Sequence, residues 1–164
     1  MTERGPRYAG FWIRLAAGFW DFSIFAMLTL AAVAARKMGV PGAVFRFWGD
    51  TVRITNSLYE ILLVASLWQA TLGMRWCGIK VVNYQGERLS FLHSVGRWLA
   101  VGMWIILIRK LQRDFGATPM TAGVVGLIVL ANGLLIAFTP KKQALHDYLA
   151  RTLVIYDEEA EKVS

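Results

Sequence analysis

The sequence predicts an all-α integral membrane protein with about four transmembrane helices, a short cytoplasmic amphipathic helix and a small β pairing. The 164 residues are 56% hydrophobic and 18% charged, with a mean hydropathy of +0.45, whereas soluble chains average about 45–50% apolar and about 25% charged residues. Seven tryptophans support this prediction, because indole rings favour the membrane–water interface. In addition, four apolar runs approach the roughly 20 residues that a helix needs to cross a bilayer.

The expected spans belong to a single domain that covers residues 1–164, and they lie near residues 11–35, 53–72, 91–108 and 121–138. The first run is longer than the apolar part of a signal peptide, about 7–15 residues, and Arg14 and Asp21 interrupt it. We therefore predict that it is a retained helix. The fourth run, TAGVVGLIVLANGLLIAF, is rich in glycine and bounded by Pro119 and Pro140. Small residues in a span let helices approach closely.

The connections between the spans are uneven. Residues 36–52 mix aromatic residues with arginines, which suits either a segment at the membrane interface or an aromatic-anchored loop. Ile79–Val82 and Leu153–Ile155 are typical of short strands. We predict that they pair with each other on the cytoplasmic side, because an isolated strand leaves its backbone groups unpaired. Residues 141–151, between the last span and the second strand, are expected to form the amphipathic helix.

The charge is basic, with 18 Lys and Arg against 11 Asp and Glu, a net charge of +7 and a pI of about 9.9. The cations are scattered between apolar runs, which favours topology-setting loops that touch anionic lipid over binding of nucleic acid. If the N-terminus is cytoplasmic, the inner segments carry nine Lys and Arg and the outer loops carry seven. This bias predicts that both termini are cytoplasmic. The acidic run Asp157–Glu161 is expected to be solvated.

Motifs of common enzymes are absent from the sequence. It has no Gly-x-Ser-x-Gly elbow, no phosphate-binding GxxxxGK[ST] loop, no HExxH and no Gly-x-Gly-x-x-Gly after a strand. His93 and His146 are far apart, and the single Cys77 cannot form an internal disulfide. We therefore expect no enzyme activity, no cofactor and no metal, with an intramembrane site of unfamiliar chemistry as the alternative.

Charged residues inside the spans are the best candidates for function, because each costs about 2.5–3.5 kcal/mol at the centre of a membrane helix. Arg14 and Asp21 lie seven residues apart, so they share a helix face but are separated by roughly 10 Å along the axis. We expect each to meet a neighbouring helix, with Glu60 and Arg97 as candidate partners. The alternative is that Arg14, Glu60 and Arg97 snorkel to the headgroups. Asp21, near the middle of its span, must be protonated, paired or facing water.

Three linked blocks carry a resemblance to a known family. They are AGFWIRL at residues 9–15, reaching on to Asp21; TLGMRWCGIKVV at residues 71–82; and QALHDYLARTLV at residues 143–154. Together they resemble the RDD family of small membrane proteins, which is named for one arginine and two aspartates. The resemblance implies that these residues are Arg14, Asp21 and Asp147. One departure is Met74, where the family commonly has lysine.

Two functions follow as hypotheses. The resemblance implies membrane transport, including the cation/proton exchange suggested for some members, and Asp21 at mid-depth agrees with it. The alternative is a non-catalytic membrane adaptor or assembly protein whose buried charges are structural. The expected polar network in either case consists of Arg14, Asp21, Asp147, Glu60, Arg97 and Arg75.

Asp147 is expected to be at least partly buried and bonded to Arg75, Arg14 or a backbone N–H of residues 71–80. A local pair with Arg151, one helical turn away, is the simpler alternative. The expected partners are the lipid bilayer, anionic lipid at the basic loops, a monovalent cation or proton, and further copies of the chain. A homo-oligomer is expected because four thin helices are too few to enclose a pathway. The expected location is the cell (inner) membrane of a prokaryote.

Overall fold

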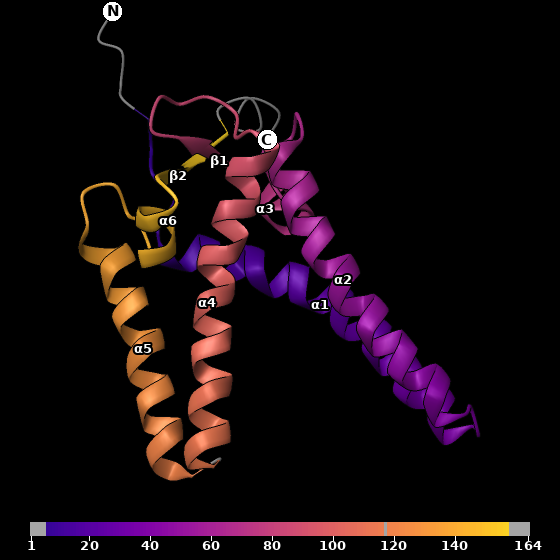
Figure 1. Ribbon diagram of the computed structural model, residues 1–164. Helices are drawn as coiled ribbons and strands as arrows, with labels where there is room; N and C mark the ends of the chain where they lie inside the picture. Colours follow the sequence, from indigo (N-terminus) through magenta and orange to yellow (C-terminus); the bar gives the residue numbers. More distant parts are fainter. Residues whose placement is uncertain (1–5, 117, 158–164) are drawn as a thin grey trace, which may run out of the picture.

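A computed structural model describes residues 6–116 and 118–157 (Figure 1). The elements are α1 (Phe11–Lys37), α2 (Gly42–Ala65), α3 (Leu72–Trp76), β1 (Ile79–Asn83), α4 (Phe91–Phe115), α5 (Pro119–Phe138), α6 (Leu145–Leu149) and β2 (Thr152–Tyr156). The long helices form two arms, α1 with α2 and α4 with α5. Both arms diverge from one end of the molecule, which carries the sheet, α3 and α6 (Figure 1).

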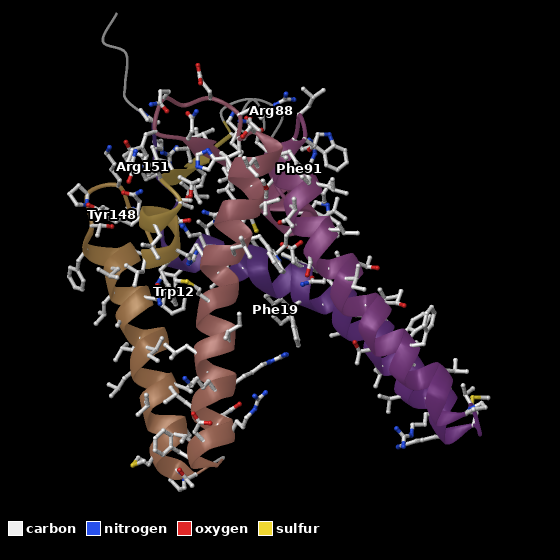
Figure 2. The ribbon with its side chains drawn as sticks, viewed as in Figure 1. Trp12, Phe19, Arg88, Phe91, Tyr148 and Arg151 are labelled. Carbon is white, nitrogen blue, oxygen red and sulfur yellow. The ribbon has the colours of Figure 1, made fainter. Side chains whose placement is uncertain are left out.

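The fold is that of an integral membrane protein, mostly helical with a two-stranded sheet. Among the described residues, α1, α4 and α5 are long and apolar enough to cross a membrane. Their large apolar side chains remain on the surface, as Trp12 and Phe19 do in Figure 2. Apolar surface of this extent belongs in lipid. The apolar part of α2 covers only Ile54–Ala65, which is shorter than the roughly 20 residues of a full span.

The second expected span, 53–72, was wrong at both ends. The helix begins at Gly42, so most of the connection predicted for residues 36–52 is helical, and it ends at Ala65. The Ser66 hydroxyl donates to a carbonyl of the last turn at 2.6 Å, and Gln69 adopts a left-handed φ of 54°. Thr71 then caps α3, with its Oγ1 accepting from the N–H of Met74 at 3.3 Å. Side chains that bond to local backbone end a helix even where the sequence stays apolar.

The other three spans are found with longer bounds. The helix α4 continues past the expected end at residue 108 as far as Phe115, because the polar stretch RKLQRDF consists mostly of good helix formers. The helix α5 begins at Pro119, earlier than the expected residue 121. The Thr118 side chain caps it by accepting from the Thr121 N–H at 3.3 Å, and proline suits the first helical position.

The predicted pairing of the two strands is confirmed. They run antiparallel, with Val81 opposite Val154. The segment before α1 adds to this sheet, since Tyr8 forms a bridge with Ile155 and the Ala9 N–H donates to the Val154 carbonyl at 2.9 Å. The buried apolar core lies here and includes Ala9, Val81 and Val154. The sheet therefore fixes the start of α1.

The expected short amphipathic helix is present, but it is shorter than residues 141–151. Only Leu145–Leu149 is helical. Its fully buried side chain is Asp147, whereas Tyr148 and Leu149 are exposed. The helix buries an aspartate because its neighbours on that side are the cations Arg14 and Arg97. Asp157, expected to be solvated, pairs with Lys80 at 3.1 Å, and residues 158–161 lie outside the described part of the chain.

Candidate functional site

Asp147 is the centre of a buried ionic cluster. Its side chain has no exposed surface, and its carboxylate accepts hydrogen bonds from the guanidinium groups of Arg14 and Arg97. The backbone N–H of Ala144 donates to it as well, at 3.1 Å. The carboxylate therefore joins the first turn of α1 and the second turn of α4 to α6. A buried charge is tolerated only with such complete pairing.

The two arginines extend the cluster into the backbone. Nε of Arg14 donates to the carbonyl of Ala9 at 2.9 Å, and its Nη2 donates to the carbonyl of Lys142 at 2.6 Å. Nη1 of Arg97 donates to Thr152 Oγ1 at 2.7 Å. Arginine can do this because its guanidinium presents several donors in a fixed plane. The cluster thus connects the start of α1, the end of the α5–α6 loop and β2.

His146 lies beside the same carboxylate, with Nε2 at 3.4 Å from Oδ1 of Asp147. Burial would raise the pKa of Asp147, but the charges of Arg97 and Arg14 outweigh burial and hold that pKa well below its usual range. Burial lowers the pKa of His146 to about 4, with Arg97 and Arg14 adding to the effect against the attraction of Asp147. At neutral pH the cluster therefore holds an ionised Asp147 and a neutral His146.

Asp21 is held by neutral donors. Its Oδ1 accepts from the Tyr59 hydroxyl at 2.7 Å and from the Gly73 N–H at 2.9 Å, while its Oδ2 accepts from the Thr71 hydroxyl at 2.6 Å. The Tyr59 hydroxyl in turn accepts from the Leu72 N–H at 2.8 Å. The carboxylate thus connects α1 to α2 and to the start of α3.

Gly73 allows this connection by its lack of a side chain. A Cβ at this position would lie 2.2 Å from the carbonyl oxygen of Ala17 and 2.9 Å from Cγ of Asp21. Both Gly73 and Ala17 are buried. The helix α3 therefore lies directly against the backbone of α1, and the position requires glycine.

A cavity of about 680 Å³ lies between the two arms. Its lining includes all four of the charged residues that the sequence placed inside spans, Arg14, Asp21, Glu60 and Arg97. Three of them are held by the bonds described above. Glu60, by contrast, forms no hydrogen bond or ion pair with any of the side chains that the structure describes. Its charge interacts with the charges of Arg97 and Asp21, which line the same cavity.

The expected pairing of these charges was wrong. Arg14 and Arg97 both bind Asp147, and Asp21 has hydroxyl and amide donors in place of an arginine. The reason is tertiary: α6 enters between the starts of α1 and α4 and brings its own carboxylate, while Asp21, about 10 Å deeper along α1, faces the start of α3.

Arg75 is also outside the site. Of the alternative partners expected for Asp147, Arg75 is not the one observed, since its guanidinium lies over the Trp68 ring, 4.7 Å from the centroid. Gly73 faces α1, and a residue two positions later points about 200° around the helix. The predicted burial of Asp147 and its bond to Arg14 are both observed.

Sequence reasoning missed the neutral members of the site, Tyr59, Thr71, Gly73 and Thr152. One signal was available, because threonine before a short run of helix formers is a typical cap. When such a cap is followed two residues later by a glycine, the start of the helix can pack closely against the backbone of another helix. The tyrosine and Thr152 carry no such signal, since their partners come from distant segments.

The fold and this site define a class: a small integral membrane protein whose helices are joined by Arg14 and Asp21 of α1, Arg97 of α4 and Asp147 of α6. The chain belongs to the RDD family, whose sequence pattern matches residues 8–151. It is similar to three proteins of Bacillus subtilis (strain 168). It is 32% identical to "Uncharacterized protein YxaI" over 90% of this chain and 97% of that protein. It is 28% identical to "Uncharacterized protein YckC" (90% and 84%) and 25% identical to "Uncharacterized membrane protein YteJ" (92% and 82%).

Proposed function

We propose that this RDD family protein is a membrane transport protein that moves a monovalent cation or a proton through the cavity between its arms. The observation that carries the proposal is Glu60, a carboxylate on the cavity wall with no hydrogen bond or ion pair among the described residues. Ionisable groups at membrane depth are rare and typically mark ion or proton pathways. The suggestion of cation/proton exchange for some RDD family members agrees with this function.

Glu60 is better suited to exchange than the two aspartates. A carboxylate exchanges a proton for a cation when its pKa is close to the working pH. Asp21 and Asp147 would have to give up bonds that connect helices, whereas Glu60 can gain or lose a proton without breaking any bond described above. In this mechanism Asp21 and Asp147 hold the cavity walls and Glu60 carries the ion.

Flux into proteoliposomes tests the proposal. We expect the wild-type protein to move Na⁺, K⁺ or H⁺ and Glu60→Gln to abolish the movement. Glu87→Gln is the matched control, because Glu87 is exposed between β1 and α4 and bonds only locally, to Asn83. A wild-type protein that moves none of the three ions would end the transport proposal. Normal flux in Glu60→Gln would remove the role of Glu60.

The variant Asp21→Asn distinguishes a residue that carries the ion from a residue that holds the cavity walls together. An amide cannot accept three hydrogen bonds from the donors around it without turning its NH₂ toward one of them. We expect this variant to lose flux together with thermal stability, measured by melting in detergent. Glu60→Gln should lose flux and keep its melting temperature.

A second candidate function is that of a non-catalytic membrane adaptor or assembly protein. The observation in its favour is that Asp21 and Asp147 are fully bonded within the chain. This function predicts no ion flux from the wild type, and effects of Asp21→Asn and Asp147→Asn on stability or assembly alone. Neither function requires an enzymatic reaction or a cofactor.

We also propose a homo-oligomer in the cell (inner) membrane of a prokaryote. The two arms diverge from the sheet end (Figure 1), and we propose that further copies complete a pathway along the cavity between them. The sheet end carries both described chain ends, together with Arg88 and Arg151 (Figure 2), and cytoplasmic segments are rich in such cations. Crosslinking that yields only monomer, or labelling of the sheet end from outside the cell, would contradict these assignments.

A further inference from the structure

A second hollow, of about 920 Å³, lies between the first turns of α1 and one face of α5. Its floor on α5 includes Gly126, Gly133 and Ala137, and its walls on α1 include Phe11 and Trp12. The three small residues are seven and four positions apart, so they lie on the same face of the helix. We call this hollow the α1–α5 groove. It is separate from the charged cavity and uses the opposite side of α1.

The groove has the length of one membrane leaflet. Gly126 and Ala137 are eleven residues apart, which corresponds to about 16 Å along an α-helix. The hydrocarbon core of a bilayer is about 30 Å thick, so one leaflet contributes about 15 Å. An extended acyl chain that starts at the sheet end of α5 would therefore reach the middle of the membrane, passing beside the Phe11 ring, which packs over Gly133.

The sheet end of the groove carries a positive charge. Lys142 lines the groove just beyond the end of α5, and its Nζ would lie 3.6 Å from a Cβ built on Gly10. Its ammonium forms no hydrogen bond or ion pair with the described residues, while its carbonyl is held by Arg14 at 2.6 Å. The backbone of Lys142 is therefore held in place, while its ammonium group can bind an anion.

Trp12 lies at the same level of the membrane as the ammonium group of Lys142. It lies on the groove wall, is 76% exposed, and stands near the sheet end of the arms in Figure 2. Exposed indole rings favour the headgroup region. The groove thus places an apolar channel below this level and an ammonium at it, which is the arrangement that a phospholipid requires.

We propose that the α1–α5 groove binds an anionic phospholipid, with one acyl chain along α5 and the phosphate at Lys142. A second copy of the chain would also cover apolar surface, but a helix would leave the ammonium without a counter-charge. The lipid site does not depend on the transport function, since it uses neither Glu60 nor the cavity.

Native mass spectrometry of the full chain in mild detergent tests the headgroup contact. Phosphatidylglycerol and phosphatidylcholine with identical acyl chains are the probes, and we expect phosphatidylglycerol to be retained more strongly. Lys142→Gln should lower its affinity about fivefold, as expected for the loss of one basic charge near the headgroups, and Lys141→Gln should change it by less than about twofold. Lys141 is the matched control because its ammonium lies over the Tyr84 ring, 4.8 Å from the centroid.

Filling the groove tests the acyl contact. A Cβ at Gly126 meets no atom within 4 Å, so Gly126→Leu places its side chain in the groove and should reduce the binding of both lipids. Gly123→Leu is the control, since Gly123 is equally open but does not line the groove. Equal retention of the two lipids with no effect of Lys142→Gln would overturn the proposal. So would a Gly126→Leu protein that loses an oligomeric contact and retains lipid normally, which would assign the groove to a second copy.

Discussion

The two ends of this molecule are stabilised by different environments. At the sheet end, Val81, Leu89 and Val154 have at most 1% of their surface exposed. Along α5, Leu127 and Leu130 are 66% and 56% exposed. The first end is a small water-excluding core like that of a soluble domain, whereas the arms rely on lipid to cover their apolar surface.

The polar clusters lie where these two regimes meet. Within the first three turns of α1, Arg14 bonds to Asp147 of α6, and Asp21 bonds to Thr71 before α3. Both bonds lie before the point where the arms diverge. In a membrane, van der Waals contact and hydrogen bonds replace the hydrophobic effect as the forces between helices. Substitutions in the sheet end and its polar clusters should therefore destabilise the fold, whereas substitutions along the arms should not.

The largest effect is expected for Asp147→Asn. Removal of the shared carboxylate leaves the buried cations Arg14 and Arg97 without a counter-charge, and breaking a buried pair destabilises by about 3–5 kcal/mol. Thermal melting in detergent measures the loss. Asp157→Asn is the control, because its partly exposed pair with Lys80 contributes at most about 1 kcal/mol. Equal melting temperatures for the two variants would contradict the burial argument.

Gly73→Ala should have the next largest effect. The new methyl group would meet the Ala17 carbonyl oxygen at 2.2 Å, and the shift of α3 that relieves the clash would also stretch its bond to Asp21. Overpacking of this kind costs about 1–3 kcal/mol. Gly96→Ala serves as the control in the same melting experiment, because a Cβ at Gly96 meets nothing within 4 Å. An unchanged melting temperature in Gly73→Ala would mean that α3 is not tightly held on α1.

Acid should weaken the sheet end through His146. Its folded pKa of about 4 lies below the ordinary value of 6.5, so its contribution to stability is complete above pH 6.5 and is lost as the pH falls toward 4. Asp147 also has a lowered pKa, and its contribution is lost only at lower pH. We expect the melting temperature to fall across this window and His146→Gln to flatten the slope. A wild-type slope that persists in His146→Gln would assign the effect to another group.

The smallest effect is expected for Leu127→Ala on the outer face of α5. Lipid or detergent contacts this side chain in the folded arm, and exposed substitutions usually change stability by less than about 0.5 kcal/mol. Leu89→Ala is the contrast, since Leu89 is 1% exposed and loss of a buried leucine costs about 2–5 kcal/mol. A large loss in Leu127→Ala would show that this face is covered by protein, and would revise the comparison.

The amino-acid sequence alone was enough to predict the membrane class, three of the four long helices and the pairing of the two strands. These features follow from local signals that do not depend on distant residues: the length of an apolar run, and a strand that must pair. The family blocks likewise singled out Arg14, Asp21 and Asp147 before any geometry was known.

Only the tertiary structure decided which charges meet. Asp147 binds Arg14 and Arg97, Asp21 binds hydroxyl and amide donors, and Glu60 is left on the cavity wall. The reach of a side chain is a few ångströms, whereas these side chains and their side-chain partners are separated by 38 to 133 positions along the chain. A pattern of residues shows that a charge inside a span needs a partner, but the entry of α6 between the starts of α1 and α4 determines which partner it finds.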